Sequence, residues 1–435
     1  MSITSSFYTG LSGLSTHGTA MGVVGDNIAN INTTGYKNSS PQFEDILGQS
    51  LSGVQGSNQT GAGTNVQSID VNYIQGTFET TEVPTDVAIN GRGFFVVKDS
   101  STNEQYYTRA GHYHFDNEGY YVNPEGKRVQ GFLYDSTGTN LIESLSDIQV
   151  NQNSMIAPQV TTTAEMILNL DSSSTIPAGG FLIANPNGTS NFSTPITIYD
   201  SLGQAHVIQV YFTNISTVAN PRRWEWHAII ANSDTSAGGA GYALFGQGVT
   251  VGSTLLEFNP SGVLTSPTAA ITFHDQTANA ITYANGVAAT NSTIDFRGTT
   301  EYGAVSAVQT INQNGYAPGS ASAIAIDEQG NLTANYTNGQ VKKIARLAVA
   351  NFPNINGLSR KGGTLYSETV ASGQPLINKP GVGGMGSISS SMLEESNVDL
   401  AGEIIKMIVI QRGYEANSKV ISTTDAMMNT LINIR

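Results

Sequence analysis

Apolar side chains near the N-terminus fall on one stripe of an α-helix. Their steps of three, four or seven positions match the helical period. The stripe consists of Phe7, Leu11, Leu14, Met21, Val24, Ile28 and Ile31. Five glycines interrupt it, and each interior glycine disfavours a helix by about 1 kcal/mol relative to alanine. We therefore expect a helix that is marginal alone and becomes ordered when further helices cover the stripe.

The C-terminal segment carries a stricter repeat, in which apolar residues recur every seven positions. The repeat and its widening positions are Leu393, Leu400, Ile404, Met407, Ile410, Tyr414, Ile421, Met428 and Leu431. A seven-residue repeat predicts a seam for another helix. Packing of each helix on a globular core would give a similar pattern, but two stripes at opposite ends of the chain favour association between helices.

Between these ends the hydrophobic period changes to two, which is typical of strands. Asn90-Gly91 and Asn338-Gly339 each predict a hairpin turn. A five-residue turn, apolar-Asx-x-x-Gly, recurs six times and predicts tight reversals between strands; it is FDNEG, VNPEG, YDSTG, YDSLG, FNPSG and IDEQG. None of these turns has the distal glutamate of a calcium loop. The fold class is therefore α+β and multidomain, with terminal helices around mainly antiparallel β domains.

Composition narrows the function. Charged residues make up 12% of the chain, the net charge is -14, and there is no cysteine. The acidic balance argues against nucleic acid, and the lack of cysteine excludes disulfides, thiolate metal sites and cysteine nucleophiles. Residues 1–30 have neither a basic segment followed by an apolar run nor a membrane-spanning stretch. We expect no signal-peptide cleavage and no membrane insertion.

Candidate chemistry is sparse. His112 and His114 alternate along a strand, a spacing that binds metal only if other ligands converge, and a solvated pair is favoured. GVGGMG at 381–386 matches a dinucleotide-binding pattern, but it follows Lys379-Pro380 and not a strand. We interpret its glycines as a hinge before the C-terminal helix, at Gly381, Gly383, Gly384 and Gly386. No nucleophile, base, cofactor or metal site is predicted, so an enzyme is disfavoured.

Three ordered motifs carry a resemblance to a known family. They are GDNIAN followed by TGYK at residues 25–37, QGTFETTEVPTDVAINGRGFFVV at 75–97, and the segment from LEESNVDLAGEI to the C-terminus, at 393–435. Together they resemble the axial proteins of the bacterial flagellar rod and hook. The chain departs from the family at Asp26, where asparagine is frequent, and at His17-Gly18, where small apolar residues are usual.

Within that family the resemblance to hook members is strongest. A separate β domain is inserted at 161–306, whereas rod members are usually much shorter, and NQNGYAPG at 312–319 is similar to a hook segment. The resemblance implies a structural subunit that self-assembles into a curved, flexible tube, transmits torque from rod to filament and encloses an export channel. A distal rod or hook-filament junction protein is the alternative, and a β-rich surface adhesin is a more distant one.

The resemblance also implies a nested domain order. The expected parts are a terminal helical domain of 1–36 plus 387–435, an extended linker of 37–77 plus 381–386, an inner β domain of 78–160 plus 307–380, and an outer β domain of 161–306. Gly35 is expected to be a further hinge, where the chain leaves the N-terminal helix.

Partners and location follow from the same resemblance. Export through the flagellar type III apparatus to the extracellular hook is implied, and Phe43 with Leu47 resembles the element read by the export gate. The implied partners are further copies of the chain, the distal rod, hook cap and hook-filament junction proteins, and the hook-length-control and export components.

Overall fold

The computed structural model describes residues 3–53, 56–150, 155–249, 254–278 and 280–433. These residues form two compact units. The first unit comprises Met1–Gln152, Ser322–Asn335 and Val341–Arg435, and the second comprises Asn153–Ala321 and Tyr336–Gln340. The second unit thus contains the whole of the insertion expected at 161–306.

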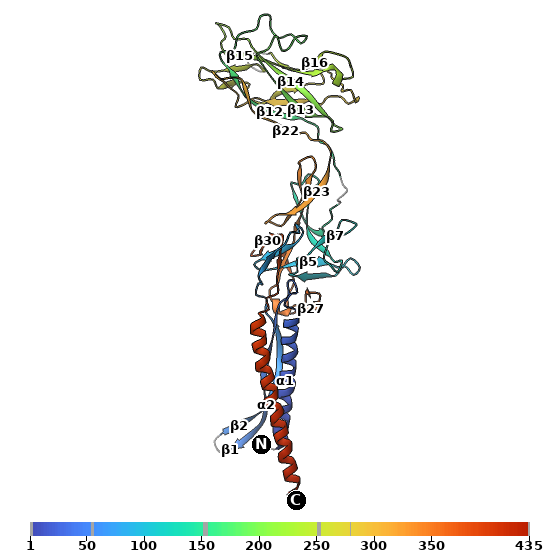
Figure 1. Ribbon diagram of the computed structural model, residues 1–435, viewed down its shortest axis with the longest axis vertical. Helices are drawn as coiled ribbons and strands as arrows, with labels where there is room; N and C mark the ends of the chain where they lie inside the picture. The colour runs from blue at the N-terminus through green and yellow to red at the C-terminus, as the bar shows by residue number, and fades with distance from the viewer. Residues whose placement is uncertain (1–2, 54–55, 151–154, 250–253, 279, 434–435) are drawn as a thin grey trace. The chain divides into compact units, whose positions relative to one another are not determined.

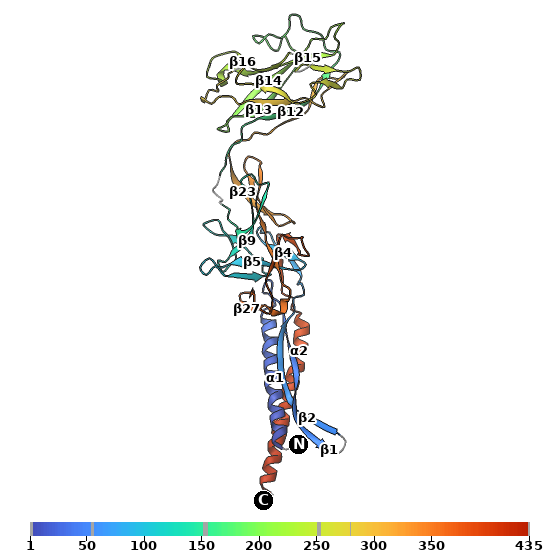
Figure 2. The same cartoon turned by 180° about the vertical axis from the view of Figure 1, so that it is seen from behind.

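Two long helices form one end of the first unit. Helix α1 (Ile3–Ala29) and helix α2 (Leu400–Asn433) lie side by side and run in opposite directions (Figures 1 and 2). A hairpin of strand β1 (Ser39–Gly53) and strand β2 (Gly56–Val71) lies along α1. This hairpin occupies most of the expected linker of 37–77, so the segment is extended but paired with itself.

The C-terminal helix begins later than the seven-residue repeat suggested. Asp399 caps α2, because its Oδ1 accepts a hydrogen bond from the Ala401 N–H at 3.1 Å. Leu393 lies instead in strand β31 (Met392–Glu394), which pairs with strand β3 (Phe78–Thr80). The assignment of Leu393 to the helix is therefore wrong, since strand pairing upstream of the cap supplies the backbone hydrogen bonds.

The inner β body of the first unit is built mainly from antiparallel strands. Its remaining strands are β4 (Val87–Asn90), β5 (Phe94–Lys98), β6 (Gln105–Thr108), β7 (His114–Phe115), β8 (Tyr121–Val122), β9 (Arg128–Tyr134), β10 (Leu141–Asp147), β24 (Asn331–Tyr336), β25 (Val341–Leu347), β26 (Val349–Asn351), β27 (Ser359–Gly362), β28 (Leu365–Ser367), β29 (Leu376–Asn378) and β30 (Ser387–Ser390). One 3-10 turn spans Ile355–Gly357. The core of this body includes the fully buried Phe95, Tyr121, Leu332 and Val349.

The two predicted Asn-Gly hairpins have different outcomes. Strands β24 and β25 pair around Asn338-Gly339, which confirms that hairpin. Strands β4 and β5 flank Asn90-Gly91 but belong to different sheets, because β4 pairs with β30 and β5 pairs with β6, β9 and β26. The hairpin expected there is wrong, since a partner from the distant C-terminal segment takes the edge of β4.

The second unit is a sandwich of two sheets. One sheet has the order β13-β14-β15-β17-β18 with β16 on β15, and the other has the order β19-β20-β12-β21 with β22 on β12. The strands of the sandwich are β12 (Thr163–Asp171), β13 (Phe192–Tyr199), β14 (Ala205–Asn214), β15 (Arg223–Ala231), β16 (Tyr242–Gly248), β17 (Leu256–Phe258), β18 (Leu264–Ser266), β19 (Ile271–His274), β20 (Ser292–Asp295), β21 (Thr300–Tyr302) and β22 (Ala307–Gln313), with a 3-10 turn at Asn232–Asp234. Strands β11 (Met155–Ile156) and β23 (Gly319–Ile326) pair with each other and belong to the sheet that contains β24. Trp224, Trp226, Phe212 and Phe296 fill the space between the sheets.

All six predicted apolar-Asx-x-x-Gly turns are present. In each turn the glycine N–H donates to the carbonyl of the Asx residue, and the glycine φ lies between 74° and 83°. The Asx side chain accepts further backbone hydrogen bonds, as Asp116 does from Glu118 and Tyr120. The turns therefore form for the local reason expected from their sequence.

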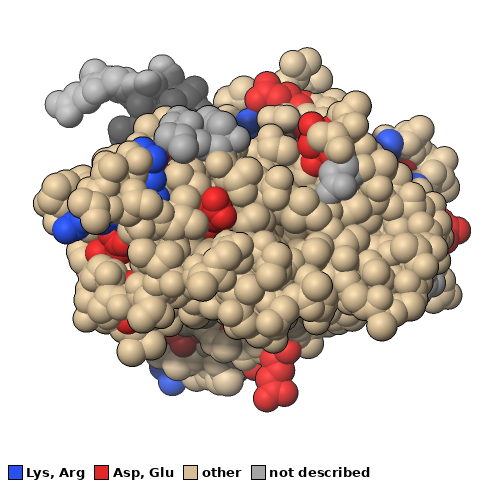
Figure 3. All heavy atoms as spheres, turned by 90° about the horizontal axis from the view of Figure 1, so that it is seen from above, with Lys and Arg blue, Asp and Glu red and all other residues tan. Residues whose placement is uncertain are grey.

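On the face shown in Figure 3, charged side chains are scattered and do not form a continuous patch. Among the described residues no helix is long and apolar enough to cross a membrane. The same residues contain no group of three or more histidine, aspartate and glutamate side chains that could hold a metal ion.

Candidate assembly site

Small residues form the seam between α1 and α2. On α1 the buried positions are Gly10, Gly13, Thr16, Ala20, Val24 and Asn27. A Cβ atom on Gly13 would lie 2.6 Å from Asn417 Oδ1, and one on Gly413 would lie 2.7 Å from the His17 ring. These glycines are therefore required by close helix approach, which accounts for part of the glycine content that weakens α1 alone.

Apart from Val24, the predicted N-terminal stripe lies beside this seam and not in it. Val24 is 2% exposed, whereas Phe7 and Leu11 are 40% and 47% exposed. Leu14, Met21 and Ile28 are only partly buried. Ile31 is also partly buried, but it lies in a turn after α1 ends at Ala29, so its assignment to the helix is wrong. The single chain thus covers its own small residues and leaves most large apolar side chains of α1 accessible.

Helix α2 exposes many large apolar side chains on the surface that α1 does not cover. Of the predicted positions, Met407, Ile410 and Ile421 are partly buried, while Leu400, Ile404, Tyr414, Met428 and Leu431 are 40–60% exposed. The sequence analysis missed further exposed apolar residues, namely Ile405, Ile408, Val409, Val420, Met427 and Ile432. The sequence contains a signal for several of these residues, since six of the seven positions at 404–410 are apolar. A helix with apolar side chains on all sides must be packed against other elements on all sides.

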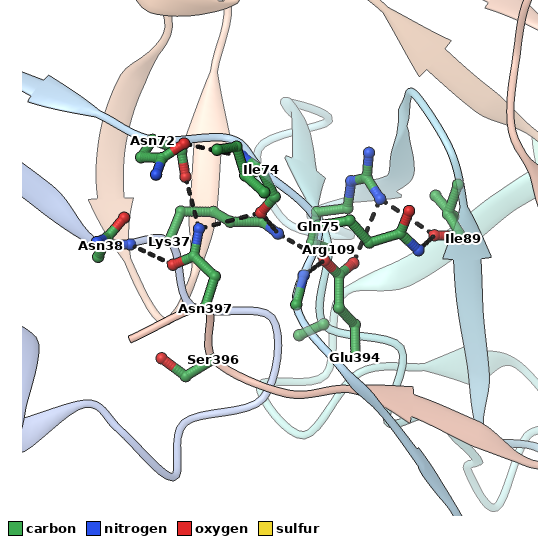
Figure 4. Close-up of polar contacts among 12 residues, drawn as sticks. Lys37, Asn38, Asn72, Ile74, Gln75, Ile89, Arg109, Glu394, Ser396 and Asn397 are labelled. Atoms are coloured by element: carbon green, nitrogen blue, oxygen red, sulfur yellow. Dashed lines mark hydrogen bonds and ion pairs between the residues drawn. The ribbon is translucent and has the colours of Figure 1, made fainter. Parts of the chain in front are cut away.

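Above the helices, a buried carboxylate joins distant parts of the chain. The Glu394 side chain is 0% exposed; Oε1 lies 2.5 Å from Lys37 Nζ and Oε2 lies 3.3 Å from Arg109 Nη1 (Figure 4). The Gly76 N–H also donates to Glu394 Oε1 at 3.0 Å, and the Gly35 N–H donates to the Glu394 carbonyl at 2.7 Å. We call Lys37, Arg109 and Glu394 the Glu394 junction.

The two cations of the Glu394 junction have further acceptors. Lys37 Nζ donates to the Ile74 carbonyl at 2.8 Å, and Arg109 donates to the carbonyls of Ile89 and Gly91 at 3.2 and 2.7 Å. Burial lowers the pKa of Lys37 and of Arg109, and the Glu394 carboxylate opposes this effect in both cases. The group is thus a nearly dry, hydrogen-bonded ion cluster.

Asn397 extends the same connection toward α2. Its Oδ1 accepts from the Asn38 N–H at 2.8 Å, and its Nδ2 donates to the carbonyls of Asn72 and Ile74 at 2.8 and 3.0 Å (Figure 4). All three sequence motifs therefore meet here. The sequence analysis did not pair these residues, although charged side chains inside two of the motifs, Lys37 and Glu394, were a usable signal in a weakly charged chain.

The expected hinge glycines fall into two groups. A Cβ atom on Gly35 would lie 2.5 Å from the Ala110 nitrogen, and one on Gly386 would lie 2.6 Å from the Asn90 carbonyl oxygen, so both are tightly packed. Gly381, Gly383 and Gly384 have φ values of 73°, 65° and 81°, and their Cβ positions meet at most one side-chain atom. A hinge role stays a prediction, and the second group suits it better.

The expected export element lies on β1 of the hairpin. Phe43 and Leu47 are 48% and 63% exposed, and the Phe43 ring centre is 6.0 Å from that of His17. An export role stays a prediction that the exposure of both side chains permits.

Comparison with family models places the chain in a class. It matches the flagella basal body rod protein model over residues 7–37, the flagellar hook D1 domain model over 88–164, the flagellar basal body protein FlaE D2 domain model over 169–316, and the C-terminal model of flagellar basal body rod proteins over 389–434. The chain is thus an axial protein of the bacterial flagellum.

Full-length relatives narrow this class. The chain is 33% identical to the flagellar hook protein of Treponema pallidum, with 99% of each chain covered, and 33% identical to that of Salmonella typhimurium, with 99% of this chain and 100% of the other covered. It therefore belongs to the flagellar hook protein family, whose members are structural subunits of the hook. A crystal structure of a Helicobacter pylori hook protein shares the fold, with a TM-score of 0.50, 16% identity, and coverage of 73% of this chain and 100% of that one.

Proposed function

We propose that the chain polymerises into a curved, flexible hook tube through the uncovered apolar faces of α1 and α2. The single observation that carries the proposal is the exposure of large apolar side chains around α2, including Ile405 at 63% and Val409 at 64%. Burying one such side chain stabilises association by about 1.5–3 kcal/mol. A handful of them offsets the roughly 4–15 kcal/mol that association costs in lost freedom.

The same arrangement supports different mechanical roles for the terminal helices and the second unit. Continuous helix seams resist twist, because a slip in register separates every packed pair. The Glu394 junction connects both helices to the inner β body, so torque passes from one to the other through buried ion pairs. The second unit carries polar, weakly charged surfaces, and hydrated contacts between such surfaces are exchanged at little cost during bending.

Location and partners are proposed from the family. The chain would leave the cell uncleaved through the flagellar type III apparatus, with Phe43 and Leu47 available to the export gate, and would act in the extracellular hook. Its contacts there would be further copies of itself, the distal rod, the hook cap and the hook-filament junction proteins, with length-control and export components acting during assembly.

Two substitutions on the uncovered face of α2 test the proposal. The Ile405→Asn/Val409→Asn variant should keep the circular dichroism of the parent but form no tubes in electron micrographs under polymerising conditions. Val218→Asn is the matched control, because Val218 is fully exposed in the second unit. This variant should assemble normally. Normal curved tubes from the double variant would show that these faces do not drive assembly.

A further inference from the structure

The helix seam contains one hydrogen bond that joins two buried polar side chains on different helices. The Asn27 side chain, in the last turn of α1, is 0% exposed, and Glu403, in the first turn of α2, is 2% exposed. Asn27 Nδ2 donates to Glu403 Oε2 at 3.1 Å. A buried amide and carboxylate facing each other across two helices need an explanation beyond packing.

Asn27 uses its amide fully. Its Nδ2 also donates to the Ser39 carbonyl at 2.7 Å, while its Oδ1 accepts from the Ser39 N–H at 2.9 Å and from the Tyr36 hydroxyl at 3.3 Å. Asn27 therefore holds the end of α1 against the start of β1. The end of α1 therefore cannot shift relative to Ser39 and Tyr36 without breaking these hydrogen bonds.

Glu403 depends on Asn27 for one of its two oxygens. Oε1 accepts from Lys406 Nζ at 2.6 Å, and this lysine belongs to the same helix and is half exposed. Lys406 therefore moves with Glu403 when α2 slides. The hydrogen bond to Asn27, on the other helix, is the contact of the Glu403 carboxylate that depends on the alignment of α2 along α1.

The rest of the seam also fits this alignment, but only sterically. Along it, Gly10 faces Ile421, Gly13 faces Asn417, and Gly413 faces His17, so the helices are aligned in antiparallel order. A slip of one turn sets Asn27 against Met407 and Glu403 against Ile31, which breaks the Asn27–Glu403 hydrogen bond and leaves the buried Glu403 Oε2 without its donor.

We propose that Asn27 and Glu403 form a register lock, which selects the one alignment of α2 along α1 seen in the structure. Buried polar residues in helix seams are well attested in this role. The inference rests on the proposed assembly function, because the alignment decides which apolar side chains face neighbouring copies. One turn of slip moves the exposed residues of α2 by about 5.4 Å along the helix axis.

Disulfide trapping measures the alignment directly, since the chain has no cysteine of its own. Gly13→Cys/Asn417→Cys reports the native alignment, because a Cβ atom on Gly13 lies 2.7 Å from Asn417 Cγ, where a cysteine sulfur would sit. Gly13→Cys/Ile421→Cys reports a slip of one turn. Each pair is oxidised in the full chain, as monomer and as polymer, and intrachain bonds are recognised by an unchanged monomer mass.

The lock is then removed by Asn27→Leu/Glu403→Leu, which keeps the seam apolar. We expect the ratio of slipped to native disulfide to rise by about tenfold or more, because the slipped state then no longer loses a buried hydrogen bond or leaves a carboxylate oxygen unpaired. Glu403→Gln keeps an acceptor for Asn27 and should retain the parent ratio. If the leucine pair loses its helical circular dichroism, Glu403→Met alone gives the decisive ratio.

If the ratio of slipped to native disulfide in Asn27→Leu/Glu403→Leu equals that of the parent chain, the register lock is wrong. The same holds for Glu403→Met if the double variant loses its helical circular dichroism. The outcome is separable from that of the proposed function. If the parent chain failed to form tubes while the ratio still responded to these substitutions, assembly through α1 and α2 would be contradicted and the lock would stand.

Discussion

Lys37 Nζ lies 2.5 Å from Glu394 Oε1, and neither side chain is exposed to solvent. The two residues are 357 positions apart in the chain. Their contact links the segment that leaves α1 to the segment that enters α2, and Arg109 of the inner β body shares the same carboxylate. The folding of the two helices and the folding of the inner β body are therefore energetically coupled through the Glu394 junction.

Removing the shared carboxylate should destabilise the first unit most. Glu394→Leu leaves two buried cations unpaired, and breaking a buried pair in this way costs about 3–5 kcal/mol. Lys37→Met should cost less, because Arg109 still faces Glu394. Hydrogen exchange of the β4 amides measures the loss.

Two controls accompany that measurement. Lys379→Met removes a lysine whose partner, Glu143, is 80% exposed, and should change stability by less than about 1 kcal/mol. Fluorescence of Trp224 and Trp226 reports on the second unit and should not respond to any of these substitutions. Equal effects of Glu394→Leu and Lys379→Met would contradict the role of the Glu394 junction.

Alkaline pH should weaken the first unit through Tyr36. Burial, followed by a hydrogen bond to Asp26, raises the pKa of Tyr36 from 10.0 to about 12. Between those values the folded state binds more protons than the unfolded state, so the free energy of unfolding falls as pH rises from 10 toward 12. Urea unfolding monitored by the β4 amides at pH 8 and pH 11 measures the fall.

Tyr36→Phe isolates this contribution. The variant lacks the titrating hydroxyl, so its stability should decline less between the two pH values than that of the parent chain. Other tyrosines affect parent and variant equally. An identical decline in both chains would show that Tyr36 does not carry the effect.

Two glycine-to-alanine substitutions in the helices should have opposite signs. At Gly22 a Cβ atom meets nothing within 4 Å, so alanine should stabilise the helix by up to about 1 kcal/mol. At Gly413 a Cβ atom lies 2.7 Å from the His17 ring, so alanine should lower the melting temperature of the helical signal at 222 nm despite its better propensity. Stabilisation at both positions would mean that the seam is looser than the structure has it.

Trypsin cleavage within α2 should depend on assembly. Arg412 and Lys419 are exposed in the single chain and become covered if the helices pack against neighbouring copies, whereas Lys37 is already buried. We expect rapid cleavage after Arg412 and Lys419 in the monomer, little in the polymer, and none after Lys37 in either. Early cleavage after Lys37 would contradict the closed Glu394 junction.

Local patterns predicted much of this fold. The helix stripes and all six Asx turns depend on neighbouring residues, and they are present in the structure. The sequence could not predict that β4 pairs with β30, because that choice depends on a segment roughly 300 residues later. For the same reason the Asn90-Gly91 hairpin was expected wrongly, and Leu393 was assigned to a helix that Asp399 caps further on.

The candidate site was predicted unevenly. Periodicity identified the large apolar residues that remain exposed, such as Phe7 and Leu400, since these follow a simple repeat. It did not reveal the small-residue seam, because Gly13 and Gly413 carry no hydrophobic signal and are needed only for close approach. Nor could it pair Lys37 with Glu394 or Asn27 with Glu403, since nothing local joins residues so far apart.

Hydrogen exchange of α2 in monomer and polymer tests the central claim most directly. The account predicts that amides of Leu400–Asn433 exchange much more slowly in assembled tubes than in the monomer, while those of β15 in the second unit stay unchanged. Equal exchange of α2 in the two states would contradict assembly through the terminal helices.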